Sequence, residues 1–109
     1  MKIQMHLHNE PFEKVKKGLK VVEGRVLDKK RKEILKGNEL VFINRKDEEK
    51  VFVIVTKIEK FKSFTQMCDK IKSEDLGYKS KEEFLTELKR FYSKEDEKEG
   101  VIAISFKLK

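Results

Sequence analysis

The beginning of the chain passes from a two-residue spacing of apolar side chains to a helical one. Over residues 2–8 apolar and polar side chains alternate, which predicts a half-buried strand. A short helix is predicted next, because apolar side chains then recur at helical spacing, at Phe12, Val15 and Leu19. Asn9 stands where it can cap the start of this helix, and Gly18 stands where helices commonly end.

Three strand-like segments follow. Residues 20–27 are typical of a strand that contains Gly24, and a glycine inside a strand indicates a bulge or a close backbone approach. Residues 39–45 and 51–61 are rich in β-branched side chains, and the charged residues between them predict a hairpin turn. Residues 28–36 form a basic connection between the first and the second of these strands.

Two more helices are predicted by serine residues that begin capping boxes. Ser63 is followed three residues later by Gln66, and Ser80 by Glu83, so each pair can satisfy backbone N–H groups at a helix start. Apolar side chains at helical spacing follow each serine, at Phe64, Met67, Cys68 and Ile71, and at Phe84, Leu88 and Phe91. Residues 101–108 then predict a last strand.

The order of these elements predicts the fold class. Because the strands outnumber the helices and follow one another directly, we expect an α+β fold with a mostly antiparallel sheet. Five or six short strands can close into a small β-barrel, which removes exposed edges, with the short helices flanking it. We expect residues 101–108 to pair with strands of the N-terminal half, and residues 1–109 to form a single domain.

The charge of the chain is high and unevenly distributed. Charged residues make up 43% of the 109 residues, and the net charge is +7. Eight basic and three acidic residues lie between Lys17 and Lys36, and clustered cations of this kind favour a polyanionic partner such as RNA. The alternative is a merely solvated surface, because abundant Lys and Glu with few thermolabile side chains also indicates a thermophilic source.

The sequence disfavours several other classes of protein. No apolar run approaches the roughly 18–20 residues that cross a bilayer, and the first residues lack the apolar stretch of a secretory signal, so we expect a cytoplasmic protein without a membrane partner. Cys68 is the single cysteine, which excludes an internal disulfide, and we expect it to be a small buried helix residue. His6 and His8 have a spacing that can bind a metal, but no third ligand is evident and we expect no metal site.

Residues 18–25 concentrate the side chains that can form a ligand site. Glu23 and Arg25 lie two apart and therefore share one face of a regular strand, which Lys20 can reach if the chain bends at the turn. The Arg25 fork suits phosphate, Lys20 adds a mobile charge, and Glu23 between them stays ionised and can orient Arg25, accept a hydrogen bond or act as a base. Gly24 can leave room for a planar ligand. The alternative is a surface ladder of salt bridges that contributes little to stability.

The same segment resembles a known family. The run G-x-K-x-x-E-x-R at residues 18–25, after a strand and a short helix, is similar to the signature of ASCH domains, which belong to the PUA-like superfamily. The likeness continues over nearly the whole chain, in residues 28–31, 34–42, 62–64, 91–93 and 100–104. Asn38 stands where the family usually has Asp, a change that touches only the turn.

The resemblance implies a PUA-like β-barrel with a cleft beside the first helix, lined by Lys20, Glu23 and Arg25, and it implies RNA as the partner. Some relatives are similar to amidohydrolases that act on acylated cytidine with a lysine, a threonine and a glutamate. Lys20 matches the lysine, but Glu23 stands in place of the threonine, and a carboxylate is not a hydroxyl nucleophile. Glu74 or Asp75 can serve as the third residue.

Two hypotheses therefore stand, and neither calls for a cofactor. The first is a non-catalytic module that binds RNA or a nucleotide-like ligand, which requires a basic path leading away from the cleft. The second is a small hydrolase acting on RNA or a modified nucleoside, with Lys20 and Glu23 as the candidate catalytic residues. It requires one of these two side chains to be enclosed, with a shifted pKa.

Side chains outside residues 18–25 carry weaker signals for a ligand. Tyr92 and Tyr78 can stack on a base, although Tyr92 also flanks an apolar helical stripe and can belong to the core. Lys29, Lys30 and Arg31 can contact phosphate groups or can form a solvated loop.

Overall fold

The computed structural model describes residues 2–109, and for Lys2 the backbone alone. Its elements are β1 (Lys2–Leu7), α1 (Asn9–Lys16), β2 (Val22–Val26), a 3-10 turn (Arg31–Glu33), β3 (Glu39–Asn44), β4 (Lys50–Phe61), α2 (Phe64–Lys70), α3 (Lys81–Phe91), a second 3-10 turn (Asp96–Glu99) and β5 (Val101–Leu108). This order confirms the expected α+β class. Over the described residues, no helix has the length and the apolar character needed to cross a membrane.

The five strands form one sheet in the order β1-β3-β4-β5-β2. β1 pairs with β3 in parallel, and the other three pairs of neighbouring strands are antiparallel. β5 lies between β2 and β4, with Ile104 opposite Glu23 on one side and opposite Ile58 on the other. The expected pairing of the last strand with the N-terminal half is therefore confirmed.

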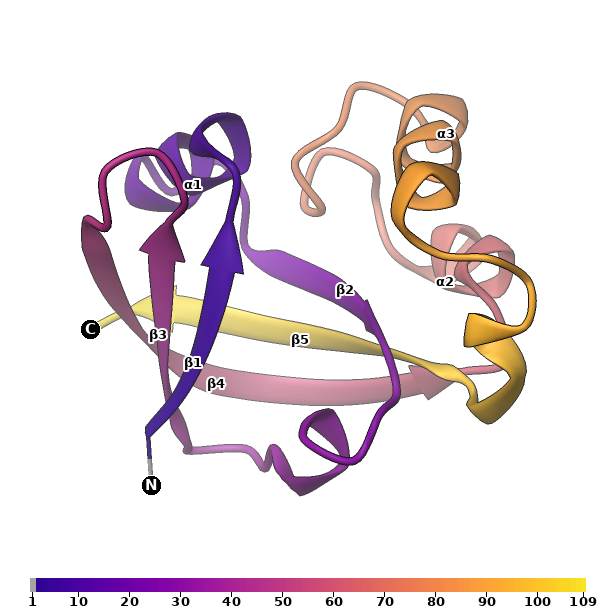
Figure 1. The fold of residues 1–109 in the computed structure, drawn as a ribbon, viewed down its shortest axis with the longest axis horizontal. Coiled ribbons are helices and arrows are strands. Elements are labelled where there is room, and N and C mark those ends of the chain that lie inside the picture. Colours follow the sequence, from indigo (N-terminus) through magenta and orange to yellow (C-terminus); the bar gives the residue numbers. More distant parts are fainter. Residues whose placement is uncertain (1) are drawn as a thin grey trace.

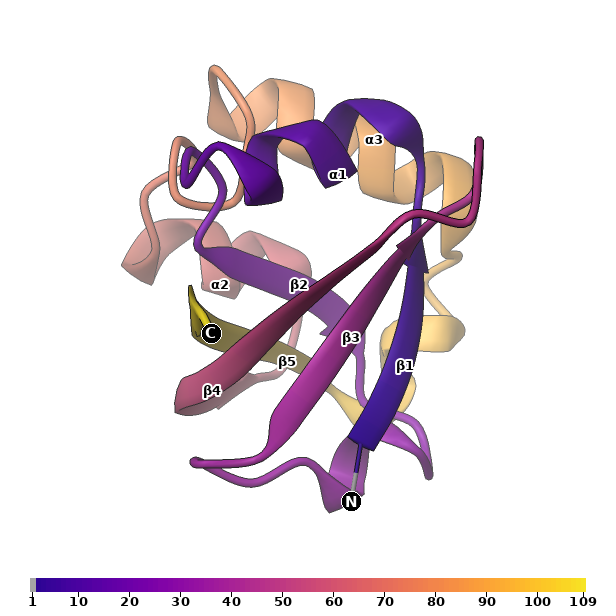
Figure 2. The same cartoon turned by 90° about the vertical axis from the view of Figure 1, so that its left-hand side faces the viewer.

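The sheet curls strongly but does not close. Figure 2 shows β1, β3 and β4 in front, with β5 and β2 passing behind them. β1 and β2 are the two edge strands in the described sheet, so the architecture is a half-barrel that is open between them. Helix α1 lies over the end of the half-barrel, and α2 and α3 lie together on one side of it (Figure 1). This opening and the helices beside it position the candidate site.

Apolar side chains pack in two clusters on either side of β2 and β5. The first fills the inside of the curl and includes Met5, Phe12, Phe42, Val53 and Ile104. The second joins the sheet to α2 and α3 and includes Val22, Met67, Leu76, Phe84 and Ala103. Alternate residues of β5 enter the two clusters, because successive side chains of a strand point to opposite faces.

The helix starts agree with the sequence in two cases and differ in the third. The hydroxyl oxygens of Ser63 and Ser80 accept hydrogen bonds from the backbone N–H groups of Gln66 and Glu83, as predicted. The expectation that Asn9 caps α1 was wrong, because Asn9 is already the first helical residue. Its side-chain oxygen instead accepts a hydrogen bond from the Asn44 side chain, which ties α1 to the end of β3.

Two expectations about single residues need correction, those for Leu19 and Cys68. Leu19 does not extend the apolar stripe of α1, since the helix ends before it and the side chain is 63% exposed. Cys68 is half-buried against the second cluster rather than fully buried. The close approach expected at Gly24 is made by Met67 and Phe84, because a Cβ added there would come within 3.0 Å of Met67 Sδ and 3.4 Å of Phe84 Cζ.

Candidate functional site

The turn between α1 and β2 carries Lys20 into the interior. Gly18 adopts a φ of 76°, and the backbone N–H groups of Leu19 and Lys20 donate to the Lys14 carbonyl at 2.8 and 3.1 Å. The Lys20 side chain then lies against Gly77, where an added Cβ would come within 3.1 Å of Lys20 Cδ. Gly77 has a φ of 92° and no side chain, so it permits this approach. As a result Lys20 is only 3% exposed.

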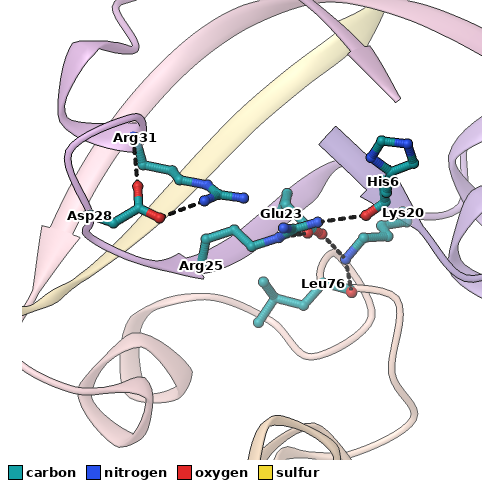
Figure 3. A network of polar contacts seen from close by, with 7 residues as sticks. All are labelled: His6, Lys20, Glu23, Arg25, Asp28, Arg31 and Leu76. Atoms are coloured by element: carbon teal, nitrogen blue, oxygen red, sulfur yellow. Dashed lines mark hydrogen bonds and ion pairs between the residues drawn. The ribbon is translucent and has the colours of Figure 1, made fainter. Parts of the chain in front are cut away.

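Lys20, Glu23 and Arg25 form a buried ionic group, shown in Figure 3. Lys20 Nζ lies 3.0 Å from Glu23 Oε1, and Arg25 Nε donates to Glu23 Oε2 at 2.5 Å. Lys20 Nζ also donates to the Leu76 carbonyl at 2.6 Å. The exposed fractions of the Glu23 and Arg25 side chains are 7% and 15%. This enclosure contradicts the alternative of an open salt-bridge ladder on the surface.

The charges of this group fix the ionisation of its carboxyl. Burial raises the pKa of Glu23, but the Lys20 and Arg25 charges and their hydrogen bonds outweigh it and lower the pKa to about 2. Burial lowers the pKa of Arg25, and the ion pair with Glu23 overcomes this and raises it. Two cations and one anion therefore share the site, with a net charge of +1, which favours an anionic ligand.

This lowered pKa makes the stability of the protein depend on acid pH. The pKa of Glu23 is about 2 in the folded state against an ordinary value of 4.5. Because the folded pKa is the lower one, the carboxylate stabilises the fold above about pH 4.5, and this contribution, about 3 kcal/mol, is lost as the pH falls toward 2. In urea unfolding across this range, Glu23→Gln is expected to lose stability less steeply than the wild type.

A suitable control for the acid range is Asp28→Asn, because Asp28 also has a lowered pKa but its side chain is 41% exposed, against 7% for Glu23. That variant is expected to keep most of the wild-type dependence on pH. Equal slopes for the wild type and Glu23→Gln would contradict the assignment of the lowered pKa to Glu23.

The ionic group forms the floor of a pocket of about 180 Å³. The pocket lies between the end of β1, β2 and helix α3. Its lining residues are His6, Leu7, His8, Pro11, Lys20, Glu23, Gly24, Arg25, Arg45, Tyr78, Phe84, Leu88, Phe91 and Tyr92. The pocket therefore combines a charged floor with walls that are largely aromatic, an arrangement that suits a planar polar ligand.

The two tyrosines of the pocket contact the ionic group directly. The Lys20 ammonium lies 5.8 Å from the centre of the Tyr78 ring. Burial, together with the nearby Glu23 carboxylate, raises the pKa of Tyr78, so its hydroxyl stays protonated at neutral pH. Tyr92 stacks on Phe64 at 5.7 Å and also interacts with the Arg25 guanidinium. Tyr92 thus belongs to both the core and the pocket, which the sequence left as alternatives.

Arg25 and Lys30 bridge the opening of the half-barrel. Arg25 Nη2 on β2 donates to the His6 carbonyl of β1 at 2.9 Å, and Lys30 Nζ donates to the Gln4 carbonyl at 2.5 Å. Both carbonyls lie on the edge of β1 that no described strand covers. Cationic side chains therefore satisfy backbone acceptors that an adjoining strand would otherwise pair, which also protects the edge against aggregation.

The sequence comparison matches the ASCH domain family over residues 5–109. This chain belongs to the ASCH domain family. The resemblance stated from the sequence, including its PUA-like placement, is confirmed. No protein with a curated functional description matches the chain.

Solved structures share the fold of this ASCH domain. Hypothetical protein PH0355 is 36% identical, with all of both chains covered and a TM-score of 0.89. A Pyrococcus furiosus protein studied by NMR in solution is 35% identical, covers 99% of this chain and 97% of its own, and has a TM-score of 0.75. An ASCH domain from Lactobacillus crispatus shares the fold at 13% identity, with 98% of this chain and 79% of that chain covered and a TM-score of 0.64.

The other residues that the sequence suggested as binding or catalytic candidates lie outside the pocket of this ASCH domain. Lys29 and Lys30 are exposed, and Arg31 is half-buried with its Nη1 donating to Asp28 Oδ2, so none of the three lines the pocket. Glu74 and Asp75, the candidates for a third catalytic residue, also lie outside the lining. The Asp75 carbonyl instead accepts hydrogen bonds from the backbone N–H groups of residues 21 and 22.

Several residues of the pocket were not recognised as such from the sequence. His6 and His8 line it, and among residues 2–109 no group of three His, Cys, Asp or Glu side chains is arranged to hold a metal. Arg45 lines it because its backbone N–H donates to the Leu7 carbonyl, where the parallel strands β1 and β3 end together. Phe91 was expected on the buried stripe of α3, but it is 52% exposed at the edge of the pocket.

Proposed function

We propose that this ASCH domain acts as a single module that binds RNA and holds one nucleotide unit in the pocket. The observation that carries the proposal is the buried group of Lys20, Glu23 and Arg25 beneath aromatic walls. The pocket volume of about 180 Å³ is below the roughly 300–1,000 Å³ of pockets for drug-sized ligands. It therefore suits one base or nucleoside better than a large cofactor.

The chemistry of the floor supports recognition of a base, a ribose or a phosphate. An ionised carboxylate accepts hydrogen bonds only, so Glu23 favours a ligand with an amino group or a hydroxyl. The Arg25 guanidinium interacts with Glu23, the His6 carbonyl and Tyr92, and with five N–H donors it retains others for a ligand. Tyr78 and Tyr92 add aromatic surface on which a base can stack.

A basic path away from the pocket supports a polymeric ligand rather than a free nucleotide. Arg25 and Lys30 contact the His6 and Gln4 carbonyls, which are two residues apart on β1. Two residues of a strand span about 6–7 Å, so the Arg25 and Lys30 side chains lie one after the other along the open edge of β1. Exposed Lys29 continues this path. An RNA backbone that follows the edge of β1 would place its phosphates beside these side chains.

Binding of RNA is expected to weaken steeply with salt, because each phosphate contact releases counterions. Replacing Lys29, Lys30 and Arg31 together by glutamine is expected to lower both the affinity and the steepness of its salt dependence. Fluorescence anisotropy of a labelled single-stranded RNA, measured at several salt concentrations, gives both quantities. An unchanged slope in the triple variant would show that the basic connection serves only to keep the surface solvated.

A control variant separates contacts made by the basic connection from net charge. It removes the same number of positive charges from three exposed lysines on other elements: Lys70, Lys89 and Lys107. This variant is expected to keep more of the wild-type affinity and slope than the first. If the two variants weaken RNA binding equally, net charge alone accounts for the effect and the proposed path is wrong.

The hydrolase hypothesis receives less support from the geometry. Lys20 and Glu23 are enclosed, as that hypothesis requires, but the pKa of Glu23 is lowered rather than raised, which makes it a weak base at neutral pH. The third residue of the expected catalytic set is missing from the pocket lining as well. Turnover of RNA or of acylated cytidine by the wild-type protein would reverse this preference.

A further inference from the structure

Phe91 is an exposed aromatic side chain at the mouth of the pocket. It ends α3, whose buried residues Phe84 and Leu88 face the second apolar cluster. Phe91 itself is 52% exposed and yet lines the pocket. A single exposed aromatic is common on protein surfaces and means little by itself. Phe91 differs from such residues because it lies at the edge of a pocket whose floor carries the Lys20, Glu23 and Arg25 charges.

The His8 ring contacts the Phe91 ring at the mouth of the pocket. The two rings stack with their centres 5.6 Å apart and their planes at 28°. His8 lies between β1 and α1, so the stack joins elements that are far apart in the sequence. Together His8 and Phe91 form a stacked pair, here called the His8–Phe91 platform, on which a base can stack only against an outer face, because the inner faces are turned toward each other. Flat aromatic surfaces of this kind stack on bases irrespective of their sequence.

A positive charge accompanies the platform. Arg45 is exposed and lines the same mouth, because its backbone N–H group is bonded to the Leu7 carbonyl next to His8. An aromatic platform beside a cation is the usual combination in sites for single-stranded nucleic acid, where bases stack and phosphates meet positive charge. The platform is also continuous with the pocket, so one strand can occupy both.

We infer that the His8–Phe91 platform binds the base next to the nucleotide held in the pocket, so that the ligand is a single strand with two consecutive bases. This inference rests on the proposed function, because the first nucleotide must occupy the pocket. Phe91 supplies the stacking surface for the second base, and Arg45 lies where the phosphate between the two units can be bound. A duplex does not fit this arrangement, since its bases are already stacked on one another.

The test separates stacking from added charge. The four ribonucleoside 5′-monophosphates are titrated first. Two extended ligands are then made from each, one with an adenosine unit added at the 5′ side and one with an adenosine unit added at the 3′ side. A parallel series carries an abasic ribose in place of the added adenosine. An adenosine extension and its abasic counterpart add the same phosphate group. The ratio of their affinities therefore reports the contribution of the added base alone.

For the wild type, the better of the two adenosine extensions is expected to bind about tenfold more tightly than its abasic counterpart, a typical effect of stacking one base on an aromatic side chain. Phe91→Ala is expected to reduce the ratio to about twofold or less, and Phe91→Trp to preserve it. Leu108→Ala is the control, because Leu108 is also an exposed apolar residue, 46% against 52%, and lies outside the pocket. It should leave the ratio unchanged.

The outcomes distinguish this inference from the proposed function. If the monophosphates bind but the wild type shows no preference for the base-bearing extension, the platform has no such role. The same conclusion follows if Phe91→Ala keeps the full preference while its melting curve shows a folded protein. If neither the monophosphates nor the extended ligands bind, the proposed function fails and the inference fails with it.

Discussion

Replacing Lys20 by methionine is expected to lower the free energy of unfolding by about 3 kcal/mol, because breaking a buried ion pair leaves a buried charge without full compensation. Glu23 would keep Arg25 as a partner but would lose the Lys20 ammonium at 3.0 Å. The Leu76 carbonyl would also lose its donor. Methionine has a similar length and fits against Gly77, so the effect comes from the lost charge and hydrogen bonds rather than from a cavity.

Two further variants make this result decisive. Lys16→Met breaks an ion pair with Glu49 in which both side chains are exposed by 40% or more, so it is expected to change stability little. The double variant Lys20→Met with Glu23→Gln removes two of the three charges and leaves the Arg25 guanidinium without its carboxylate partner, so it is expected to be no more stable than Lys20→Met alone. Urea unfolding at neutral pH measures all three. A Lys20→Met protein as stable as Lys16→Met would show that the ionic group is not buried in solution.

Much of the fold follows from local patterns in the sequence. The alternation of residues 2–8, the capping boxes at Ser63 and Ser80, and the β-branched segments each depend on residues close together in the chain. The pairing of the strands does not. The parallel pairing of β1 with β3, and the opening left between β1 and β2, follow from how the whole chain packs. The sequence indicated strands that can close into a small barrel, and the structure has a half-barrel in which the Arg25 and Lys30 side chains bridge the opening.

The part of the candidate site that depends on local patterns could be predicted from the sequence, and the part that depends on distant residues could not. Glu23 and Arg25 share a strand face because side chains alternate, and this needs no knowledge of the rest of the fold. The burial of Lys20 depends on Gly77, a residue 57 positions away, and no local pattern indicates it. Phe91 shows the opposite failure, since it continues an apolar stripe but extends beyond the cluster that buries Phe84.

Replacing Arg25 by alanine is expected to weaken binding of a ribonucleoside monophosphate at least tenfold, since a hydrogen bond to a charged group contributes about 1.5–3 kcal/mol. Within the ionic group the Arg25 guanidinium is the more exposed cation, whereas the Lys20 ammonium is already bonded to the Leu76 carbonyl and Glu23. Arg25→Lys keeps the charge but loses the planar fork, so its affinity is expected to be intermediate. Melting curves of both variants establish that the loss is not caused by unfolding.

Arg25→Ala also removes the bridge to the His6 carbonyl. A control for this structural effect is Lys30→Ala, which removes the comparable bridge to the Gln4 carbonyl but leaves the pocket lining intact. Lys30→Ala is therefore expected to bind a monophosphate like the wild type, even if it binds a longer RNA less tightly. If Lys30→Ala loses the monophosphate as Arg25→Ala does, the open edge and not the pocket floor controls binding.

The most direct test of the proposed site is an NMR titration of the wild-type protein and of Arg25→Ala with the four ribonucleoside monophosphates. For the wild type, the largest changes in chemical shift are expected at the pocket, in Glu23, Gly24, Arg25 and Tyr92, and they should be absent from Arg25→Ala. Changes confined to the basic connection at residues 28–36, or changes of equal size in both proteins, would contradict the assignment of the pocket as the nucleotide site.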